Sequence, residues 1–361
     1  MTFQIQKDVS LAELTTLKIG GRARFFASVA NETEIIEAFN FANENNLEIF
    51  ILGGGSNVLI ADQGFNGLVL RIALKGISTF TERDGLVRVK AGAGEDWDLF
   101  CKFCVEKNLQ GIECLSGIPG FVGGTPVQNV GAYGQEVAET IVMVRCFDRQ
   151  RAEFVELSNA ECGFAYRTSV FNTTEKNRYI VSTVIYALKF SGETKILYRD
   201  LQKIFGDAKP NLEETREAVL KIRREKSMVI VANDPNSQSA GSFFKNPIID
   251  KKRFAKIENR VKTFGIENIP FFEIDEETVK IPAAWLIENS GFHKGYELGQ
   301  AGISTKHTLA IINRGDASAK DILDLKEHIQ ASVKEKFDIE LKPEPVFIGF
   351  ESNDYLTITK D

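Results

Sequence analysis

Two glycine-rich segments are the first candidates for ligand binding. The shorter one, Gly53 to Asn57 (Gly-Gly-Gly-Ser-Asn), directly follows the apolar run from Leu47 to Leu52. Because glycine lacks a β-carbon, the backbone of such a segment can turn sharply and present successive N–H groups to an anion. The segment matches neither the G-x-G-x-x-G fingerprint nor the G-x-x-x-x-G-K-[ST] phosphate loop. Alone, such a segment is more often an ordinary turn than an anion-binding loop.

The longer segment runs from Ser116 to Gly134, and polar residues are interleaved with its glycines. Such a composition is poor material for a helix or a buried strand. It suits a backbone laid along a flat ligand that takes part in hydrogen bonds. A long surface loop is the alternative, although loops of this length inside compact domains usually have a function. The two segments together therefore favour a ligand cradle over two unrelated turns.

These two segments and three further motifs resemble the UDP-N-acetylenolpyruvoylglucosamine reductase family. The further motifs are Phe-Ala-Tyr-Arg-Thr-Ser-Val-Phe at 164–171, Ala-Gly-Ser-Phe-Phe-Lys-Asn-Pro at 240–247 and Pro-Glu at 343–344. The likeness is colinear from about Thr15 to Gly349. It implies an enzyme of bacterial peptidoglycan synthesis that reduces UDP-N-acetylglucosamine enolpyruvate to UDP-N-acetylmuramate. The hydride would pass from NADPH to FAD and then to the enolpyruvyl carbon.

The resemblance also implies that both glycine segments bind FAD. The residues concerned are Gly53, Gly54, Gly55, Ser56, Asn57, Ser116, Ile118, Pro119, Gly123, Gly124, Thr125, Gln128, Asn129, Gly131, Ala132 and Tyr133.

Three residues are implied in catalysis. Arg167 suits the substrate carboxylate, because a guanidinium forms two parallel charge-assisted hydrogen bonds with such a group. Ser242 is implied as the proton donor, a task of general acid catalysis. Glu344, held extended between two prolines, is implied in polarising the substrate through a shared proton. Without the resemblance, Arg167 would be interpreted as part of a structural ion pair and Ser242 as a turn residue that satisfies its own backbone.

Four residues are implied in binding the UDP moiety, namely Tyr198, Lys226, Asn246 and His307. Tyr198 resembles the tyrosine that closes over UDP in the longer subgroup of the family, and Lys226 offers a compact charge for phosphate. The chain departs from its relatives in three places. Arg199 stands where that subgroup has glycine, Val346 stands where arginine is frequent, and the 226–240 linker lacks the Lys-Leu-Pro-Asp-Pro pattern.

The composition narrows the class of protein. The chain has 361 residues, of which 43% are hydrophobic and 26% charged, and a net charge of -6. We therefore expect a globular protein without a nucleic-acid or membrane partner. The first seven residues do not resemble an export signal, and five cysteines at irregular spacing argue against a disulfide framework. We expect a cytoplasmic monomer.

The sequence predicts no metal site. Three histidines occur, and none is paired at the spacing of metal ligands. Cys101 and Cys104 form a C-x-x-C pair, but they share one helical face with Trp97 and Phe100. We interpret the two cysteines as core residues.

The periodicity predicts helices at 33–45, from Trp97, at 213–225 and at 319–337. It predicts strands at 47–52, 68–72, 87–91, 141–147 and 179–190. With the resemblance, this predicts an α+β protein with a two-part FAD-binding region of the vanillyl-alcohol-oxidase (PCMH) type and a third, α+β substrate-binding domain. The predicted divisions are 1–74, completed by 343–361, then 75–225 for FAD, and 226–342 for the UDP-sugar.

Two other functions stay open at this stage. A sugar or lactone oxidase of the same FAD-binding superfamily would share the glycine segments without needing Arg167, Ser242 and Glu344 together. A non-catalytic nucleotide-binding protein would keep the phosphate cradle and dispense with the acid. The joint presence of Ser242 and Glu344 argues against the second alternative.

Overall fold

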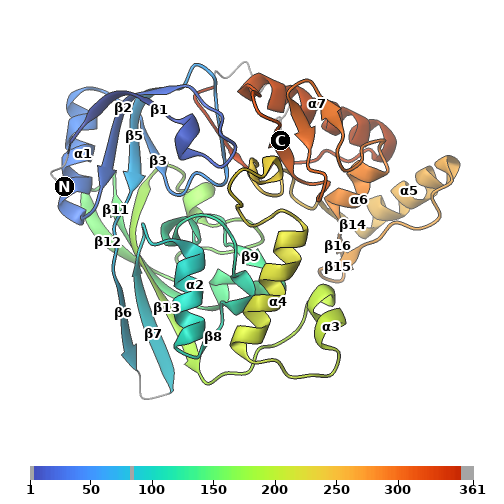
Figure 1. Ribbon diagram of the computed structural model, residues 1–361, viewed down its shortest axis with the longest axis horizontal. Coiled ribbons are helices and arrows are strands. Elements are labelled where there is room, and N and C mark those ends of the chain that lie inside the picture. Colours follow the sequence, from blue (N-terminus) through green and yellow to red (C-terminus); the bar gives the residue numbers. More distant parts are fainter. Residues whose placement is uncertain (1–3, 82–84, 351–361) are drawn as a thin grey trace. The chain divides into compact units, whose positions relative to one another are not determined.

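The computed structural model describes residues 4–81 and 85–350, which form two compact units (Figure 1). Within them, the first unit comprises residues 4–9, Ala23–Gly55 and most of 65–229. The second comprises Ser10–Arg22, Ser56–Gly64 and residues 230–350. Residues 1–3 of the predicted segment 1–74, and 351–361 of the predicted segment 343–361, lie outside the described residues. The division into three domains stays a prediction.

A sheet in the order β1-β2-β5-β3 carries the start of the first unit. Its strands are β1 (Gln6–Ser10), β2 (Arg22–Val29), β5 (Phe65–Ile72) and β3 (Ile49–Leu52), and β5 is parallel to both β2 and β3. Helix α1 (Glu32–Glu44) begins where the Asn31 side chain accepts a hydrogen bond from the Glu34 N–H. Its buried face, which includes Ile35 and Phe39, belongs to the same core cluster as the sheet. The helix and the strands predicted in this region are confirmed.

An antiparallel sheet in the order β12-β11-β13-β7-β6 forms the larger part of the first unit. The strands are β12 (Glu153–Ser158), β11 (Ile141–Asp148), β13 (Tyr179–Phe190), β7 (Leu86–Gly92) and β6 (Ile77–Thr81), while β8 (Leu109–Gln110) pairs with the end of β13. This confirms the strands predicted at 87–91, 141–147 and 179–190. Figure 1 shows the long arrows of this sheet beside α2 (Trp97–Glu106).

Helix α2 joins this sheet through its aromatic face. The Phe100 and Tyr186 ring centroids are 5.1 Å apart, and Trp97, Cys101 and Cys104 are buried in the same core. Burial raises the pKa of both thiols well above the ordinary value. The two cysteines are therefore core residues, as predicted.

Helix α4 (Leu212–Glu225) is tied to α2 by charge. Asn211 and Glu214 form a capping box at its start. Arg216 donates two hydrogen bonds to Asp98 of α2, at 2.6 and 2.9 Å. The apolar face of α4 packs with Tyr133 and with Leu201 of the short helix α3 (Arg199–Phe205). These contacts bring α3 and α4 to the longer glycine segment.

The second unit is also mixed. Strand β4 (Val58–Ile60), directly after the shorter glycine segment, pairs in parallel with β20 (Val346–Ile348). The other sheets are antiparallel, in the orders β17-β18-β19 and β14-β16-β15. The first sheet consists of β17 (Glu297–Leu298), β18 (Ala301–Ile303) and β19 (Ile311–Asn313). The second consists of β14 (Ile248–Asp250), β16 (Thr278–Lys280) and β15 (Phe272–Glu273). Helices α5 (Lys251–Val261), α6 (Ala283–Glu288) and α7 (Ala319–Phe337) complete the unit.

The predicted long helix at 319–337 is confirmed as α7. Ser318 and Asp321 form its capping box, and the Asp62 carboxylate accepts from the Ala319 N–H at 2.8 Å. Its predicted apolar stripe is buried, at Ile322, Leu325, Ile329 and Val333. The remaining strands are β9 (Gly131–Ala132) and β10 (Gln135–Glu136), and single-turn 3₁₀ helices occur at Ala12–Leu14, Glu113–Leu115, Val122–Gly124, Val137–Glu139, Val170–Asn172, Pro235–Ser237 and Lys262–Phe264.

Strands and helices are grouped rather than regularly alternating, which is the α+β pattern predicted from the sequence. Of the helices formed by residues 4–81 and 85–350, none has both the length and the apolar character that a bilayer crossing demands.

Lys326 is an unusual feature of the α7 core. Its side chain is fully buried, and its Nζ has no hydrogen-bond partner among the described residues. It forms an ion pair of 3.5 Å with the half-exposed Glu327 and lies 5.7 Å from the centroid of the Phe347 ring. Burial lowers the pKa of this ammonium below its ordinary value. A poorly paired buried charge of this kind costs folding free energy.

Replacing Lys326 by methionine should therefore raise the free energy of unfolding at neutral pH by about 1–3 kcal/mol. Between the lowered pKa and the ordinary value of about 10.4, the unfolded chain keeps a proton that the folded chain has lost, so wild-type stability rises with pH. The gain from Lys326→Met should shrink over that range. Denaturant unfolding of both proteins across pH measures it, and a loss of stability in the variant would contradict the argument. Lys320→Met on the exposed face of α7 is the control.

Candidate functional site

The two glycine segments touch each other inside the first unit. A β-carbon built on Gly54 would lie 2.7 Å from the Cα of Gly120, which is closer than real contacts allow. A β-carbon on Gly53 would meet nothing within 4 Å. The N–H groups of Gly53 and Gly54 form no hydrogen bond to any described residue. One glycine therefore permits the contact between segments, and its neighbour leaves open space with unused donors beside it.

The longer segment divides by burial. Ser116, Thr125, Asn129 and Tyr133 are buried, whereas Ile118, Pro119, Gly123, Gly124, Gln128, Gly131 and Ala132 are partly or fully exposed. Gly124 also faces open space, since a β-carbon there would meet nothing within 4 Å. The exposed members are the ones whose backbone a ligand can reach.

The buried polar side chains hold the segment in shape. The Ser116 hydroxyl donates to the Glu113 carbonyl, and the hydroxyls of Thr125 and Tyr186 are hydrogen-bonded at 2.8 Å. Asn129 Nδ2 donates to Glu136, and its Oδ1 accepts from the Ala138 N–H. These side-chain atoms are engaged within the protein. The predicted involvement of Ser116, Thr125 and Asn129 in FAD binding would therefore be chiefly through positioning the backbone.

The segment is also anchored by Asp98. Its Oδ1 accepts from the Gly117 N–H at 2.6 Å as well as from Arg216. Burial alone would raise the pKa of Asp98, but these hydrogen bonds outweigh it and lower the pKa. The ionised carboxylate thus connects α2, α4 and the start of the longer segment.

Arg167 lies at the tip of a tight turn against the same segment. Ala165 and Thr168 exchange backbone hydrogen bonds, which places Arg167 in the left-handed region at φ 56°. Its Nη2 donates to the Gly131 carbonyl at 2.7 Å, and a β-carbon on Gly131 would approach Nη1 to 3.2 Å. An uncommon backbone conformation in a bulky residue is typical of functional positions. The structure thus brings the predicted carboxylate-binding guanidinium to a predicted FAD-binding glycine.

Tyr198 and Lys226 gather around Tyr133 in the first unit. The Tyr133 and Tyr198 ring centroids are 5.3 Å apart in an edge-on contact. Lys226 Nζ donates to Asp200 Oδ2 at 2.9 Å. Burial alone would lower the pKa of Lys226, but the bond to Asp200 raises it above the ordinary value. Sequence reasoning missed Asp200, although an acidic residue two positions after Tyr198, the tyrosine predicted to close over UDP, was a visible signal.

Ser242 and Glu344 are brought together in the second unit by their backbones. The Glu344 N–H donates to the Phe243 carbonyl at 2.9 Å, and the Lys245 N–H donates to the Lys342 carbonyl. Phe243 and Phe244 anchor this pair of segments in the core. The Ser242 hydroxyl forms no hydrogen bond to any described residue, so it is not a turn serine that satisfies its own backbone. It remains available as a donor.

Asn57 belongs to the second unit and supports Glu344. Its Nδ2 donates to the Glu344 carbonyl at 3.3 Å, and its own carbonyl accepts from the Val346 N–H. The boundary between the units falls between Gly55 and Ser56, so the shorter glycine segment contributes residues to both.

Asn246 follows Ser242 by four residues, and His307 belongs to a connection whose backbone bonds to Phe243. Asn246 Oδ1 accepts from the Ala283 N–H and thereby fixes the start of α6. His307 lies in the turn between β18 and β19, two residues before Leu309, whose carbonyl accepts from the Phe243 N–H. The second unit therefore gathers Ser242, Asn246, His307 and Glu344 around one turn.

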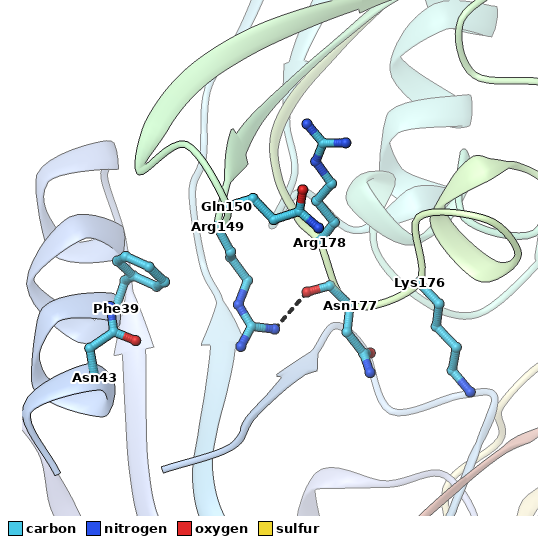
Figure 2. Close-up of a pocket in the computed structure, with 7 residues that line it drawn as sticks. All are labelled: Phe39, Asn43, Arg149, Gln150, Lys176, Asn177 and Arg178. Atoms are coloured by element: carbon cyan, nitrogen blue, oxygen red, sulfur yellow. Dashed lines mark hydrogen bonds between the residues drawn. The ribbon is translucent and has the colours of Figure 1, made fainter. Parts of the chain in front are cut away.

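A hollow of about 360 Å³ lies elsewhere in the first unit (Figure 2). Among the described residues that line it, none belongs to the predicted sites: they are Phe39, Asn43, Arg149, Gln150, Lys176, Asn177 and Arg178. Arg149 donates to the Asn177 carbonyl, and Arg178 is paired with Asp148 at 2.6 Å. Because the described residues that line it include none of the predicted site residues, the hollow is not the candidate site.

Comparison with known proteins agrees with this arrangement. A family model described as the C-terminal domain of UDP-N-acetylenolpyruvoylglucosamine reductase matches residues 234–348, and one described as an FAD binding domain matches 23–158. The UDP-N-acetylenolpyruvoylglucosamine reductase of Thermobifida fusca is 44% identical over 97% of this chain and 99% of its own length. The chain belongs to the UDP-N-acetylenolpyruvoylglucosamine reductase family. The UDP-N-acetylenolpyruvoylglucosamine reductase of Streptomyces coelicolor is 42% identical over 95% of this chain and 90% of its own length.

A solved structure supports the same family. The crystal structure of the reductase from Thermus caldophilus matches 96% of this chain and 100% of its own with a TM-score of 0.65 and 26% identity. The predicted fold class, an α+β protein with an FAD-binding region and a substrate-binding domain, is confirmed. The FAD-binding match contains both glycine segments, and the C-terminal match contains Ser242, Asn246, His307 and Glu344.

The glycine cradle fits FAD. Gly53 and Gly124 leave room, the N–H groups of Gly53 and Gly54 are unused, and the ligand would be an anion at its pyrophosphate. Sequence reasoning did not single out Gly120, whose backbone meets Gly54. Its place in a Pro-Gly pair was the signal that the backbone turns there, and its φ is 128°.

Alanine substitutions at Gly53 and Gly54 should separate the two roles of these glycines. Gly54→Ala should destabilise the flavin-free protein by about 1–3 kcal/mol, because the new methyl group collides with Gly120. Gly53→Ala should leave that stability within about 0.5 kcal/mol but should weaken FAD binding. Denaturant unfolding without flavin and a flavin titration measure the two effects. Equal effects of both substitutions on both quantities would refute the distinction.

Proposed function

We propose that this chain reduces UDP-N-acetylglucosamine enolpyruvate to UDP-N-acetylmuramate, with FAD as the cofactor and NADPH as the hydride source. The observation that carries this function is the 44% identity, over almost the whole of both chains, to a UDP-N-acetylenolpyruvoylglucosamine reductase. When bound, FAD supplies the hydride chemistry by accepting hydride from NADPH and giving it to the enolpyruvyl group. The protein then has to hold the substrate carboxylate, stabilise the added charge and donate a proton.

Arg167 holds the carboxylate in this proposal. A guanidinium that engages a carboxylate with two hydrogen bonds stabilises it more as negative charge accumulates in the transition state. The turn at 165–168 and the bond to the Gly131 carbonyl support this assignment, because they orient the side chain before any substrate arrives. Pre-orientation reduces the reorganisation that the reaction would otherwise require.

Ser242 donates the proton. A serine hydroxyl is a weak acid, but the carbanion left after hydride addition is a strong base. The absence of any hydrogen bond from this hydroxyl to the described residues supports the role. Glu344, whose backbone is bonded to Phe243 beside the serine, polarises the same reacting group.

Four residues bind the nucleotide part in this proposal. Lys226 meets the diphosphate, Asn246 and His307 contact the UDP moiety, and Tyr198 caps it as in the longer subgroup of the family. The side-chain amide of Asn246 supports this, since its Nδ2 is left for a ligand while Oδ1 holds α6. We also propose the domain division predicted from the sequence. Residues 1–74 with 343–361 form one part of the FAD-binding region and residues 75–225 form the other. Residues 226–342 bind the UDP-sugar.

The reaction places the enzyme in peptidoglycan precursor synthesis. We extend this to cell wall biogenesis and hence to cell shape, cell division and the cell cycle. We also propose a cytoplasmic monomer without nucleic-acid or membrane partners. The five cysteines are buried free thiols, which supports a reducing compartment, because disulfides are rare there.

Purified protein tests the function directly. It should carry FAD, and NADPH with UDP-N-acetylglucosamine enolpyruvate should yield UDP-N-acetylmuramate. Product is measured by mass spectrometry and NADPH consumption by absorbance. Protein that binds no FAD, or that consumes NADPH without forming the product, would disprove the proposal.

Ser242→Ala should impair one half-reaction selectively. NADPH should still bleach the flavin at a rate near that of wild type, whereas oxidation by the enolpyruvyl substrate should slow by about 10²–10⁴-fold, because the proton donor is gone. Stopped-flow absorbance measures both rates. Ser242→Cys, which retains an acidic hydrogen, should recover part of the lost rate. Equal slowing of both half-reactions in Ser242→Ala would indicate a structural role instead.

Arg167→Lys should slow the same half-reaction by about 10²-fold, because an ammonium cannot reproduce the bidentate geometry. Flavin content and the rate of reduction by NADPH should change little. Arg149→Lys, in the hollow of Figure 2, is a matched control that should behave as wild type. An Arg167→Lys variant with an unchanged second half-reaction would exclude the carboxylate role.

A further inference from the structure

The Lys226–Asp200 ion pair is a feature that the proposed function leaves unexplained. Lys226 Nζ and Asp200 Oδ2 are 2.9 Å apart, and the two side chains are 36% and 33% exposed. If Lys226 is to meet a diphosphate, the cation that should attract it is already neutralised by a carboxylate of the same chain.

The backbone of Lys226 is firmly held, so only its side chain is free to change partner. Lys226 is the C-cap of α4, and its N–H donates to the carbonyls of Ile222 and Arg224. One turn earlier, the buried Arg223 donates to the Met228 carbonyl and so fixes the chain that follows. Because the backbone is fixed in this way, the half-exposed ammonium of Lys226 can exchange one oxygen partner for another without refolding.

Asp200 is held independently of the ion pair. It lies in the first turn of α3, whose Leu201 is buried in the cluster with Tyr133 and Ile222. Tyr198, two residues before it, has its own ring contact with Tyr133. A half-exposed ion pair adds little to folding beside these apolar contacts. Loss of the pair should therefore leave α3 in place.

A carboxylate and a diphosphate are both anions and compete for the same ammonium. We propose that Asp200 is a built-in counter-ion of Lys226, which the diphosphate of the nucleotide displaces when it binds. This inference rests on the proposed function, because it takes Lys226 to be the diphosphate contact. In the free protein the pair keeps Lys226 charged and oriented near Tyr198, and its exchange sets the affinity for the nucleotide. Asp200 is thus a positioning residue that lowers the affinity of the protein for the nucleotide.

The test measures UDP binding by calorimetry on the FAD-loaded protein. Asp200→Asn should bind UDP about 3- to 5-fold more tightly, because the competing charge of a half-exposed pair is removed. Asp200→Glu retains the anion and should bind within about 2-fold of wild type. Asp207→Asn removes an equal charge just beyond the same helix and should also leave the affinity within that margin. Flavin content and melting temperature establish that each variant is folded.

Two results would overturn the inference: UDP affinity that is unchanged or lower in Asp200→Asn, or a gain that persists when Lys226 is also changed to glutamine. The first would mean that Asp200 supports the substrate contact or has no part in it, and the second that its effect does not pass through Lys226. A wild-type protein that holds FAD but neither binds UDP nor forms UDP-N-acetylmuramate would instead refute the proposed function itself. The two failures are therefore distinguishable.

Discussion

The close approach of two backbones at Gly54 and Gly120 is the constraint on which the candidate FAD site depends. Any side chain at Gly54 would push the longer segment away, since even a β-carbon would lie 2.7 Å from the Gly120 Cα. The contact places the unused N–H groups of Gly53 and Gly54 beside a second stretch of exposed backbone. Glycine is required at position 54 because the Gly120 backbone occupies the space that a side chain would need. Flexibility of the chain is not the reason.

The longer segment is kept rigid by buried polar groups that form hydrogen bonds within the protein. Asp98 accepts from Gly117 and from Arg216, and Asn129 links the segment to Glu136 and Ala138. Each bond satisfies a group that would be costly to bury alone. A cradle fixed in this way is formed before the cofactor arrives, which reduces the entropy lost on binding.

The second unit also fixes its candidate acid, Ser242, by hydrogen bonds within the protein. Hydrogen bonds between the 243–245 and 342–344 backbones, together with two buried phenylalanines, fix the turn that carries Ser242. Lys226 in the first unit is different, because its cationic group is half-exposed and has an exchangeable carboxylate partner. The groups predicted to take part in chemistry are held through bonds to the backbone, whereas the side chain proposed for phosphate binding is paired with a carboxylate that a diphosphate can replace.

The sequence by itself determined the helices and strands with clear periodicity, such as α7 and β13, because local apolar spacing reflects which face is buried. It also identified both glycine segments by their composition, and Arg167, Ser242 and Glu344 through motifs that resemble those of a known family. It did not reveal that Ser116, Thr125 and Asn129 point their polar atoms into the protein, or that Gly120 meets Gly54 and Asp200 meets Lys226. The Thr125–Tyr186, Gly54–Gly120 and Asp200–Lys226 contacts join residues far apart in the chain. They were decided only by tertiary packing, since side-chain direction and backbone proximity leave no mark on local residue type.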